Sequence, residues 1–155
     1  MNPIKARSLF PVTQRYAYLN HASAAALPVP VVQAMDRYLA GQTQCGSQAL
    51  VGWDDRLEEI RCLAARLIGA HRDEIVFTSS VSHGLNLVAA GLDWQPGDNL
   101  ICAETEFPAN VYPWLNLRRR GVEVRFAPAH CHRIRVEDVA ALMDARTRLV
   151  AISFV

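Results

Sequence analysis

The sequence predicts an α/β fold with a mostly parallel β-sheet built from βαβ units. Three observations support this prediction. From about residue 70 onward, short apolar runs alternate with helical patterns of ten or so residues. Turn residues separate them, as at Pro96-Gly97-Asp98 and Gly121. The last run, 149–155, is apolar almost throughout, which is typical of a strand covered on both faces. Strands joined by helices of this length favour parallel pairing.

Two further helices are expected before this alternating region, with an extended piece at 18–20 in front of them. The first begins near Pro28 and runs to about residue 40, with an apolar face; Gly41–Gly52 is expected to be a loop, and Gly69 to end the second helix. The predicted strands are 75–77, 100–102, 122–126 and 149–155, and the predicted helices are 28–40, 53–68, 82–92, 110–120 and 136–143. The apolar face of the first helix carries Val31, Val32, Met35 and Leu39.

The predicted domain organisation is an amino-terminal segment with the first helix, residues 1–45, followed by one α/β domain at 46–155. The last predicted strand should occupy the centre of the sheet, yet no helix follows it. Ligands of open α/β sheets bind beyond the carboxyl ends of the strands. We therefore expect the α/β domain to be truncated, without the loop that this strand would contribute.

Composition excludes several classes of partner. A formal net charge of +1 argues against nucleic acid or an acidic membrane, and Arg118-Arg119-Arg120 is best explained as a solvated helix end. The chain shows neither a signal peptide nor an apolar stretch that could span a bilayer. Its four cysteines lack CxxC spacing and indicate a reducing, cytoplasmic setting. The group His130-Cys131-His132 resembles a metal cluster but lacks a fourth ligand, so no metal is expected.

The first candidate binding segment is Ser79-Ser80-Val81-Ser82, where an apolar run meets a helix. Backbone N–H groups of Val81 and Ser82, with the Ser82 hydroxyl and the positive end of the helix dipole, would form an anion cradle. The alternative is an ordinary helix-capping serine. The chain contains neither GxGxxG nor GxxxxGK[ST], so the usual nucleotide cradles are disfavoured.

The second candidate is Phe107, which follows the strand at 100–102 and precedes Pro108. Its ring could form a platform for a flat cofactor, or it could be a core residue that closes the sheet. Asn110 is expected to cap the next helix, and Tyr112 and Trp114 to pack that helix. A third candidate is His21, in a loop of small residues that permits close approach of a ligand.

Taken in order, these segments resemble the class V aminotransferase family, the fold-type I pyridoxal-phosphate enzymes that include cysteine desulfurases and kynureninase. The likeness covers nearly the whole chain, and the Glu-Phe-Pro-Ala-Asn form is most similar to the isopenicillin-N-epimerase-like branch. The segments that carry it are 18–28, 64–70, 74–86, 94–98, 106–114, 121–124 and 147–153.

The resemblance implies the amino-terminal part of a fold-type I large domain and pyridoxal 5′-phosphate as the cofactor. Val81 and Ser82 match the positions that bind the cofactor phosphate. Phe107 matches the ring-stacking position, which is histidine in the desulfurases and so makes a desulfurase less favoured. The loop at His21 and Ala22 matches the segment that borders the substrate carboxylate. The parent enzyme is expected to act on a small amino acid and to form a homodimer.

The family's Schiff-base lysine, its acidic partner of the pyridine nitrogen and its carboxylate-binding arginine have no match here. The only lysine is Lys5, which precedes the first ordered element expected. We therefore expect a class V aminotransferase-like fragment that is inert as it stands. Two alternatives remain open: a non-catalytic α/β fragment or interaction module, and a self-sufficient domain that binds phosphorylated metabolites.

Overall fold

A computed structural model of the chain describes residues 2–154 and divides it into two compact units, of which the first ends at Val76 and the second begins at Phe77. The first holds helices α1 (Pro3–Ser8), α2 (Val29–Cys45) and α3 (Trp53–Ile68), with 3₁₀ turns η1 (Pro11–Gln14), η2 (Gly46–Leu50) and η3 (Arg72–Glu74). The boundary predicted at residues 45 and 46 concerns domain organisation and stays a prediction.

The two long helices of the first unit form where the sequence predicts them. Helix α2 extends to Cys45, past the predicted end at residue 40 and into the expected loop. Helix α3 ends at Ile68 and is capped by Gly69, whose φ of 70° places it in the left-handed region. The rings of Tyr38 and Trp53 meet edge to face, with centroids 5.0 Å apart. Apolar residues of both helices remain exposed, among them Val31, Val32, Met35, Leu39, Leu57, Ile60, Leu63 and Leu67.

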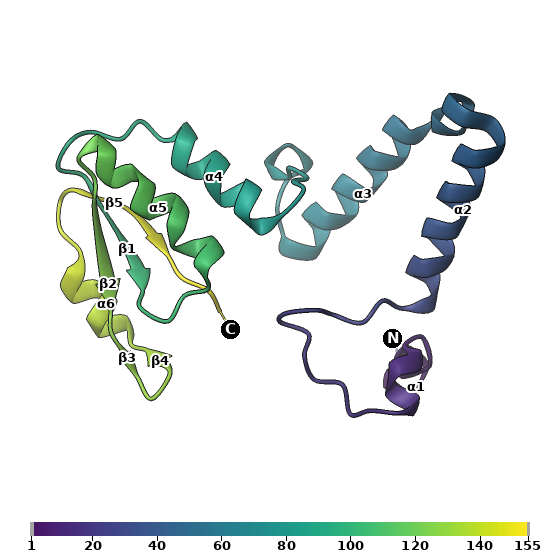
Figure 1. Cartoon of the computed structure of the whole chain (residues 1–155), viewed down its shortest axis with the longest axis horizontal. Coiled ribbons are helices and arrows are strands. Elements are labelled where there is room, and N and C mark those ends of the chain that lie inside the picture. The colour runs from purple at the N-terminus through teal and green to yellow at the C-terminus, as the bar shows by residue number, and fades with distance from the viewer. Residues whose placement is uncertain (1, 155) are drawn as a thin grey trace. The chain divides into compact units, whose positions relative to one another are not determined.

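The second unit is built on a parallel sheet of three strands in the order β2-β1-β5, which lie side by side in Figure 1. Helical segments separate β1 from β2 and β2 from β5 along the chain, so the predicted βαβ organisation is confirmed. The strands are β1 (Asn99–Ala103), β2 (Glu123–Ala127) and β5 (Thr147–Ala151), with a hairpin of β3 (Ala129–His130) and β4 (Arg133–Ile134). The helices are α4 (Val81–Gly91), α5 (Tyr112–Asn116) and α6 (Val136–Leu142), with 3₁₀ turns η4 (Pro108–Asn110) and η5 (Leu117–Arg120).

The core of the second unit lies between the sheet and the helices α4 and α5. Trp114 of α5 is almost fully buried, and every residue of β1 is buried. Burial of this many large apolar groups is the main favourable contribution to the folding of the unit. The buried cluster consists of Ala89, Trp94, Leu100, Cys102, Trp114, Leu117, Val122, Val124 and Ala151.

The predicted central position of the last strand is wrong for the part of the chain that the structure describes. Strand β5 pairs only with β1 there and ends at Ala151. Its first four residues alternate between half-buried and exposed positions, and Ala151 is buried. The central strand is β1. An apolar run thus indicated a strand correctly, but it did not distinguish a central strand from one beside it.

Two other predicted elements need correction. Residues 75–77 form no strand among the described residues. The Ile75 backbone is extended, and its carbonyl accepts a hydrogen bond from the Arg61 guanidinium. The predicted helix 110–120 is broken into η4, α5 and η5. Pro108 and Pro113 lack the N–H groups that a continuous helix needs, which favours short helical pieces here.

A hydrogen-bond network at the amino-terminal edge of the sheet joins the three strands. The fully buried side chain of Asn99 donates to Asp144 at 2.8 Å and accepts from the hydroxyl of Thr147 at 2.8 Å. Arg125 of β2 forms an ion pair with Asp144 at 2.8 Å. Hydrogen bonds from the Arg146 N–H, Asn99 and Arg125 lower the pKa of Asp144 to about 2.

Candidate functional site

The start of α4 leaves backbone donors directed out of the helix. Ser80 is the N-cap, and its hydroxyl accepts a hydrogen bond from the N–H of His83 at 3.1 Å. Val81 and Ser82 are the first helical residues, and N–H groups at these positions have no partner within the helix. Because Ser80 caps the helix, the Ser82 hydroxyl is not used in capping. The capping explanation considered for this segment therefore applies to Ser80 only.

The loop after β1 presents Phe107 to solvent. The residue is 74% exposed, which excludes the core position considered from the sequence. Its backbone is extended, with φ −65° and ψ 144°, as expected before Pro108. The carbonyl of Phe107 accepts a hydrogen bond from the N–H of Asn110 at 2.8 Å. An exposed aromatic ring thus lies on a loop with a fixed backbone.

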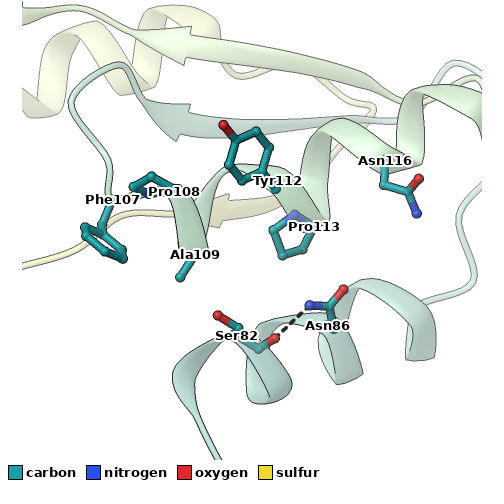
Figure 2. Close-up of a pocket in the computed structure, with 8 residues that line it drawn as sticks. All are labelled: Ser82, Asn86, Phe107, Pro108, Ala109, Tyr112, Pro113 and Asn116. Carbon is teal, nitrogen blue, oxygen red and sulfur yellow. Dashed lines mark hydrogen bonds between the residues drawn. The ribbon is translucent and has the colours of Figure 1, made fainter.

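Ser82 and Phe107 line the same groove, which has a volume of about 450 Å³ (Figure 2). Ser82 and Asn86 contribute from α4, and the opposite side comes from the loop and α5. The Asn86 amide is held by donation to the Ser82 carbonyl at 2.8 Å. The Val81 side chain is exposed and is not one of the lining residues, so its contribution to an anion cradle would be its N–H alone. The remaining lining residues are Pro108, Ala109, Tyr112, Pro113 and Asn116.

Sequence reasoning missed three polar residues of this groove: Asn86, Tyr112 and Asn116. A signal was present, because Ser82 and Asn86, and likewise Tyr112 and Asn116, are four residues apart and so share a helix face. Tyr112 was expected to pack its helix, but it is exposed and lines the groove. Trp114, by contrast, is buried as expected.

Asn110 does not cap α5 as predicted. The N-cap is Val111, without a side-chain cap. The Asn110 side chain is buried, and its Oδ1 accepts a hydrogen bond from Trp114 Nε1 at 3.0 Å. Its carbonyl accepts from the Sγ of Cys102 at 3.1 Å. Asn110 therefore joins β1, the groove loop and α5. A buried acceptor for an indole N–H cannot be distinguished from a helix cap by sequence alone.

The candidate substrate residues, His21 and Ala22, lie in the first unit. The N–H of His21 donates to the Leu19 carbonyl at 2.9 Å, and its ring meets that of Tyr18 edge to face at 5.5 Å. Ala22 is exposed. The groove lies in the second unit, and the relation of His21 and Ala22 to it stays a prediction.

Two sets of reactive side chains, Cys102 and the group His130-Cys131-His132, lie outside the groove. Burial, followed by the charge of Glu106, raises the pKa of the Cys102 thiol to about 11, so this cysteine is a poor nucleophile. Cys131 and His132 form the turn of the β3–β4 hairpin, and His130 Nε2 lies 3.0 Å from the Asp138 carboxylate. Among residues 2–154, no group of three or more His, Cys, Asp and Glu could hold a metal ion.

The fold and the groove define a class of protein: an α/β domain in which the start of a helix and an exposed aromatic ring line one groove. The family model described as aminotransferase class V matches residues 17–155, and the chain belongs to this family. Within the described residues, no helix is long and apolar enough to cross a membrane.

Curated relatives agree with the family. A probable cysteine desulfurase of Methanothermobacter thermautotrophicus is 38% identical over 153 residues, covering 94% of this chain and 38% of the relative. A cysteine desulfurase of Salmonella dublin is 37% identical over 167 residues, covering 97% of this chain and 41% of the relative. The chain therefore spans about two-fifths of the length of these relatives.

Solved structures share the fold. A C-DES mutant with glycine covalently linked to its pyridoxal-phosphate cofactor matches with a TM-score of 0.83 at 23% identity, covering 94% of this chain and 40% of that one. The apo cysteine desulfurase of Thermococcus onnurineus matches with a TM-score of 0.77 at 28% identity, covering 97% and 39%. The predicted α/β fold of a fold-type I large domain is confirmed.

Proposed function

We propose that the groove holds the phosphate and the ring of pyridoxal 5′-phosphate. The observation that carries this proposal is that Ser82, at the start of α4, and the exposed ring of Phe107 line one groove. The first helical residues offer N–H donors and the positive end of a dipole, which suit a phosphate. A volume of about 450 Å³ is ordinary for a small-molecule site. The residues present therefore fit the cofactor.

Each residue has a separate role in this proposal. The N–H groups of Val81 and Ser82 and the Ser82 hydroxyl would bind the phosphate, and Phe107 would stack on the ring. When bound, the cofactor supplies the electron sink for chemistry at the α-carbon of an amino acid. His21 and Ala22 would border the substrate carboxylate. The chain's own contribution is thus to bind and orient the cofactor.

For the whole protein we propose action on a small amino acid, a homodimeric state and a cytoplasmic location. Cysteine desulfurases among the relatives favour cysteine as a substrate to test first. Phenylalanine at position 107, in place of the desulfurase histidine, favours another reaction subtype. The products formed from cysteine distinguish a desulfurase from that other subtype. The free state of all four cysteines supports the cytoplasmic proposal.

The 155 residues alone are proposed to be catalytically inert. Their only lysine, Lys5, lies in the six-residue helix α1, which precedes every residue assigned to the groove. No other side chain could provide the covalent amine link that the family uses. Incubation with pyridoxal phosphate and cysteine should release neither sulfide nor alanine, and an activity that is lost on Lys5→Ala substitution would contradict this.

Cofactor binding is tested by titrating the chain with 4′-deoxypyridoxine 5′-phosphate, which lacks the aldehyde and so cannot react with amines. Ser82→Ala and Phe107→Ala should each weaken binding about tenfold, because each removes a hydrogen bond to an anion or an aromatic contact. The matched controls are Ser47→Ala and Phe154→Ala, since both residues are exposed and lie outside the groove. Equal affinity of all five proteins would contradict the proposal.

A second candidate function is a non-catalytic interaction module. The observation that favours it is the exposure of apolar residues on α2 and α3, including Met35, Leu39 and Leu67. Sedimentation velocity over a range of concentrations separates the candidates. A monomer that unfolds cooperatively and binds the cofactor analogue counts against a purely associative role.

A further inference from the structure

Glu106 connects the loop that carries Phe107 to the end of a neighbouring strand. It directly precedes Phe107 in the loop after β1 and is half-buried. Its carboxylate accepts two hydrogen bonds from Ser153, one from the backbone N–H and one from the hydroxyl at 2.6 Å. Ser153 follows β5, and β5 is the parallel neighbour of β1. Glu106 thus ties together the carboxyl ends of two adjacent strands.

The other side of Phe107 is also fixed. Asn110 donates its N–H to the Phe107 carbonyl at 2.8 Å, and its own carbonyl accepts from the buried Cys102 thiol. The loop therefore has an anchor on each side of Phe107, one to β5 and one to the core. Between these anchors, the Phe107 ring is exposed. Holding an exposed ring in one position costs conformational entropy. Contact between the ring and a bound ligand would offset that cost.

From this juxtaposition we infer that Glu106 is a positioning residue of the cofactor groove, which orients the Phe107 ring through its two hydrogen bonds to Ser153. The inference rests on the proposed function of the groove. Hydrogen bonds to a charged acceptor are roughly twice as strong as neutral ones, so a carboxylate is well suited to hold a loop against a strand end. Glu106 itself lines not the Phe107 groove but a second cavity, of about 370 Å³, together with Ser153.

The variant that tests this role is Glu106→Gln. Glutamine keeps the size of the side chain but is neutral. Its Oε1 can still accept the Ser153 N–H and its NH₂ can donate to the Ser153 hydroxyl, so both contacts can remain, but they lose the added strength that the carboxylate charge gives them. Glu104→Gln is the matched control. Glu104 precedes it in the same loop and also accepts a backbone N–H, but from Ala129 at 2.7 Å and not from the β5 end. Ser153→Ala removes the hydroxyl bond, leaves the backbone bond in place and serves as the second variant.

Two probes separate ring contacts from phosphate contacts. The affinity of 4′-deoxypyridoxine 5′-phosphate depends on both, whereas inorganic phosphate tests the α4 cradle alone. We expect Glu106→Gln to weaken binding of the analogue about threefold to tenfold and to reduce its induced circular dichroism, with the affinity for inorganic phosphate unchanged. Ser153→Ala should show a loss in the same direction, and Glu104→Gln should match the parent chain in all three measurements.

A double-mutant cycle with Phe107→Ala shows whether Glu106 acts through the ring. If it does, Glu106→Gln causes no further loss of analogue affinity once Phe107 is alanine. Full additivity of the losses in affinity caused by Glu106→Gln and Phe107→Ala overturns the inference. A second result also overturns it: analogue affinity unchanged in both Glu106→Gln and Ser153→Ala, although Ser82→Ala and Phe107→Ala both weaken binding. The proposed function fails separately, when Ser82→Ala and Phe107→Ala leave analogue binding unchanged, and the inference then falls with it. If Glu106→Gln does not fold, the Ser153→Ala result decides.

Discussion

The thiol of Cys102, in the middle of the sheet, donates a hydrogen bond to the carbonyl of Asn110 at 3.1 Å. This contact joins the central strand to the loop that carries Phe107, and it lies in a core where Cys102 has no exposed surface. A cysteine in such surroundings is a structural residue. Its complete burial is typical of a free cysteine that packs as a small hydrophobic side chain.

The four cysteines should differ in chemical reactivity, because Cys102 is buried whereas Cys45 and Cys131 are exposed. Because burial raises the pKa of Cys102 from 9.0 to about 11, little thiolate is present at pH 8. We expect native Cys45 and Cys131, which are exposed, to react with iodoacetamide at least about 100-fold faster than Cys102. Mass spectrometry of timed samples measures each site. In denaturant the four rates should converge, and fast native labelling of Cys102 would contradict its buried position.

Much of the fold was accessible from the sequence because local signals and tertiary packing agree there. Helix α4 begins and ends within one residue of its predicted bounds, since apolar periodicity and a serine cap indicate the same segment. Strands β1 and β2 were likewise found from apolar runs bounded by turns. The order of strands in the sheet was not accessible, because a continuous apolar run gives burial and not neighbours.

The candidate site was only partly accessible. Ser82 and Phe107 could be proposed from their positions after apolar runs, but whether Phe107 was buried depended on how the loop meets the core. That is decided by Asn110, whose buried contacts with Cys102 and Trp114 lie at separations of eight and four residues. The β5 contact of Glu106 spans 47 residues, and no local pattern indicates such a pairing.

Replacement of Asn110 should destabilise the second unit. In Asn110→Ala the buried indole N–H of Trp114 loses its acceptor, and an unsatisfied buried donor costs about 1–3 kcal/mol. Urea unfolding followed by tryptophan fluorescence measures the free energy of unfolding. Asn116→Ala is the matched control, because Asn116 is exposed in α5 and forms no side-chain hydrogen bond among the described residues. Equal stability of the two variants would argue against the Asn110 link.

The stability of the chain should fall in acid because of Asp144. Its pKa is lowered from 3.8 to about 2, first by the Arg146 N–H and then by Asn99 and Arg125. A lowered folded-state pKa means that this contribution is fully present above about pH 4 and is lost as the pH falls towards 2. We expect Asp144→Asn to be less stable than the parent at pH 6, with the difference shrinking steadily between pH 4 and pH 2.

Urea unfolding at a series of pH values measures this dependence. Asp93→Asn is the control, since Asp93 is exposed and forms no hydrogen bond or ion pair within residues 2–154. Its stability curve should run parallel to that of the parent. A constant difference between Asp144→Asn and the parent from pH 6 to pH 2 would show that the Asp144 charge is not the cause.

Gly121, which ends η5 before β2, should not tolerate a side chain. Its φ of 79° lies in the left-handed region, and an added Cβ would come within 3.2 Å of the Pro96 Cβ and 3.3 Å of the Pro96 Cα. The Gly121 carbonyl also accepts a hydrogen bond from the Gly97 N–H at 2.9 Å, so the backbone cannot easily move away. Left-handed backbone costs an L-residue about 1–2 kcal/mol, and the close contact adds to this in Gly121→Ala.

Gly91→Ala provides the opposite case for comparison. Gly91 is the last residue of α4, and nothing lies within 4 Å of the position that its Cβ would take. Alanine there should stabilise the chain by about 0.5–1 kcal/mol, because glycine has the greater backbone entropy in the unfolded state. Thermal unfolding should therefore shift in opposite directions in the two variants. Similar shifts in both variants would mean that the contact between Gly121 and Pro96 does not limit the stability of the chain. They would also mean that β2 can pair with β1 without a left-handed residue before it.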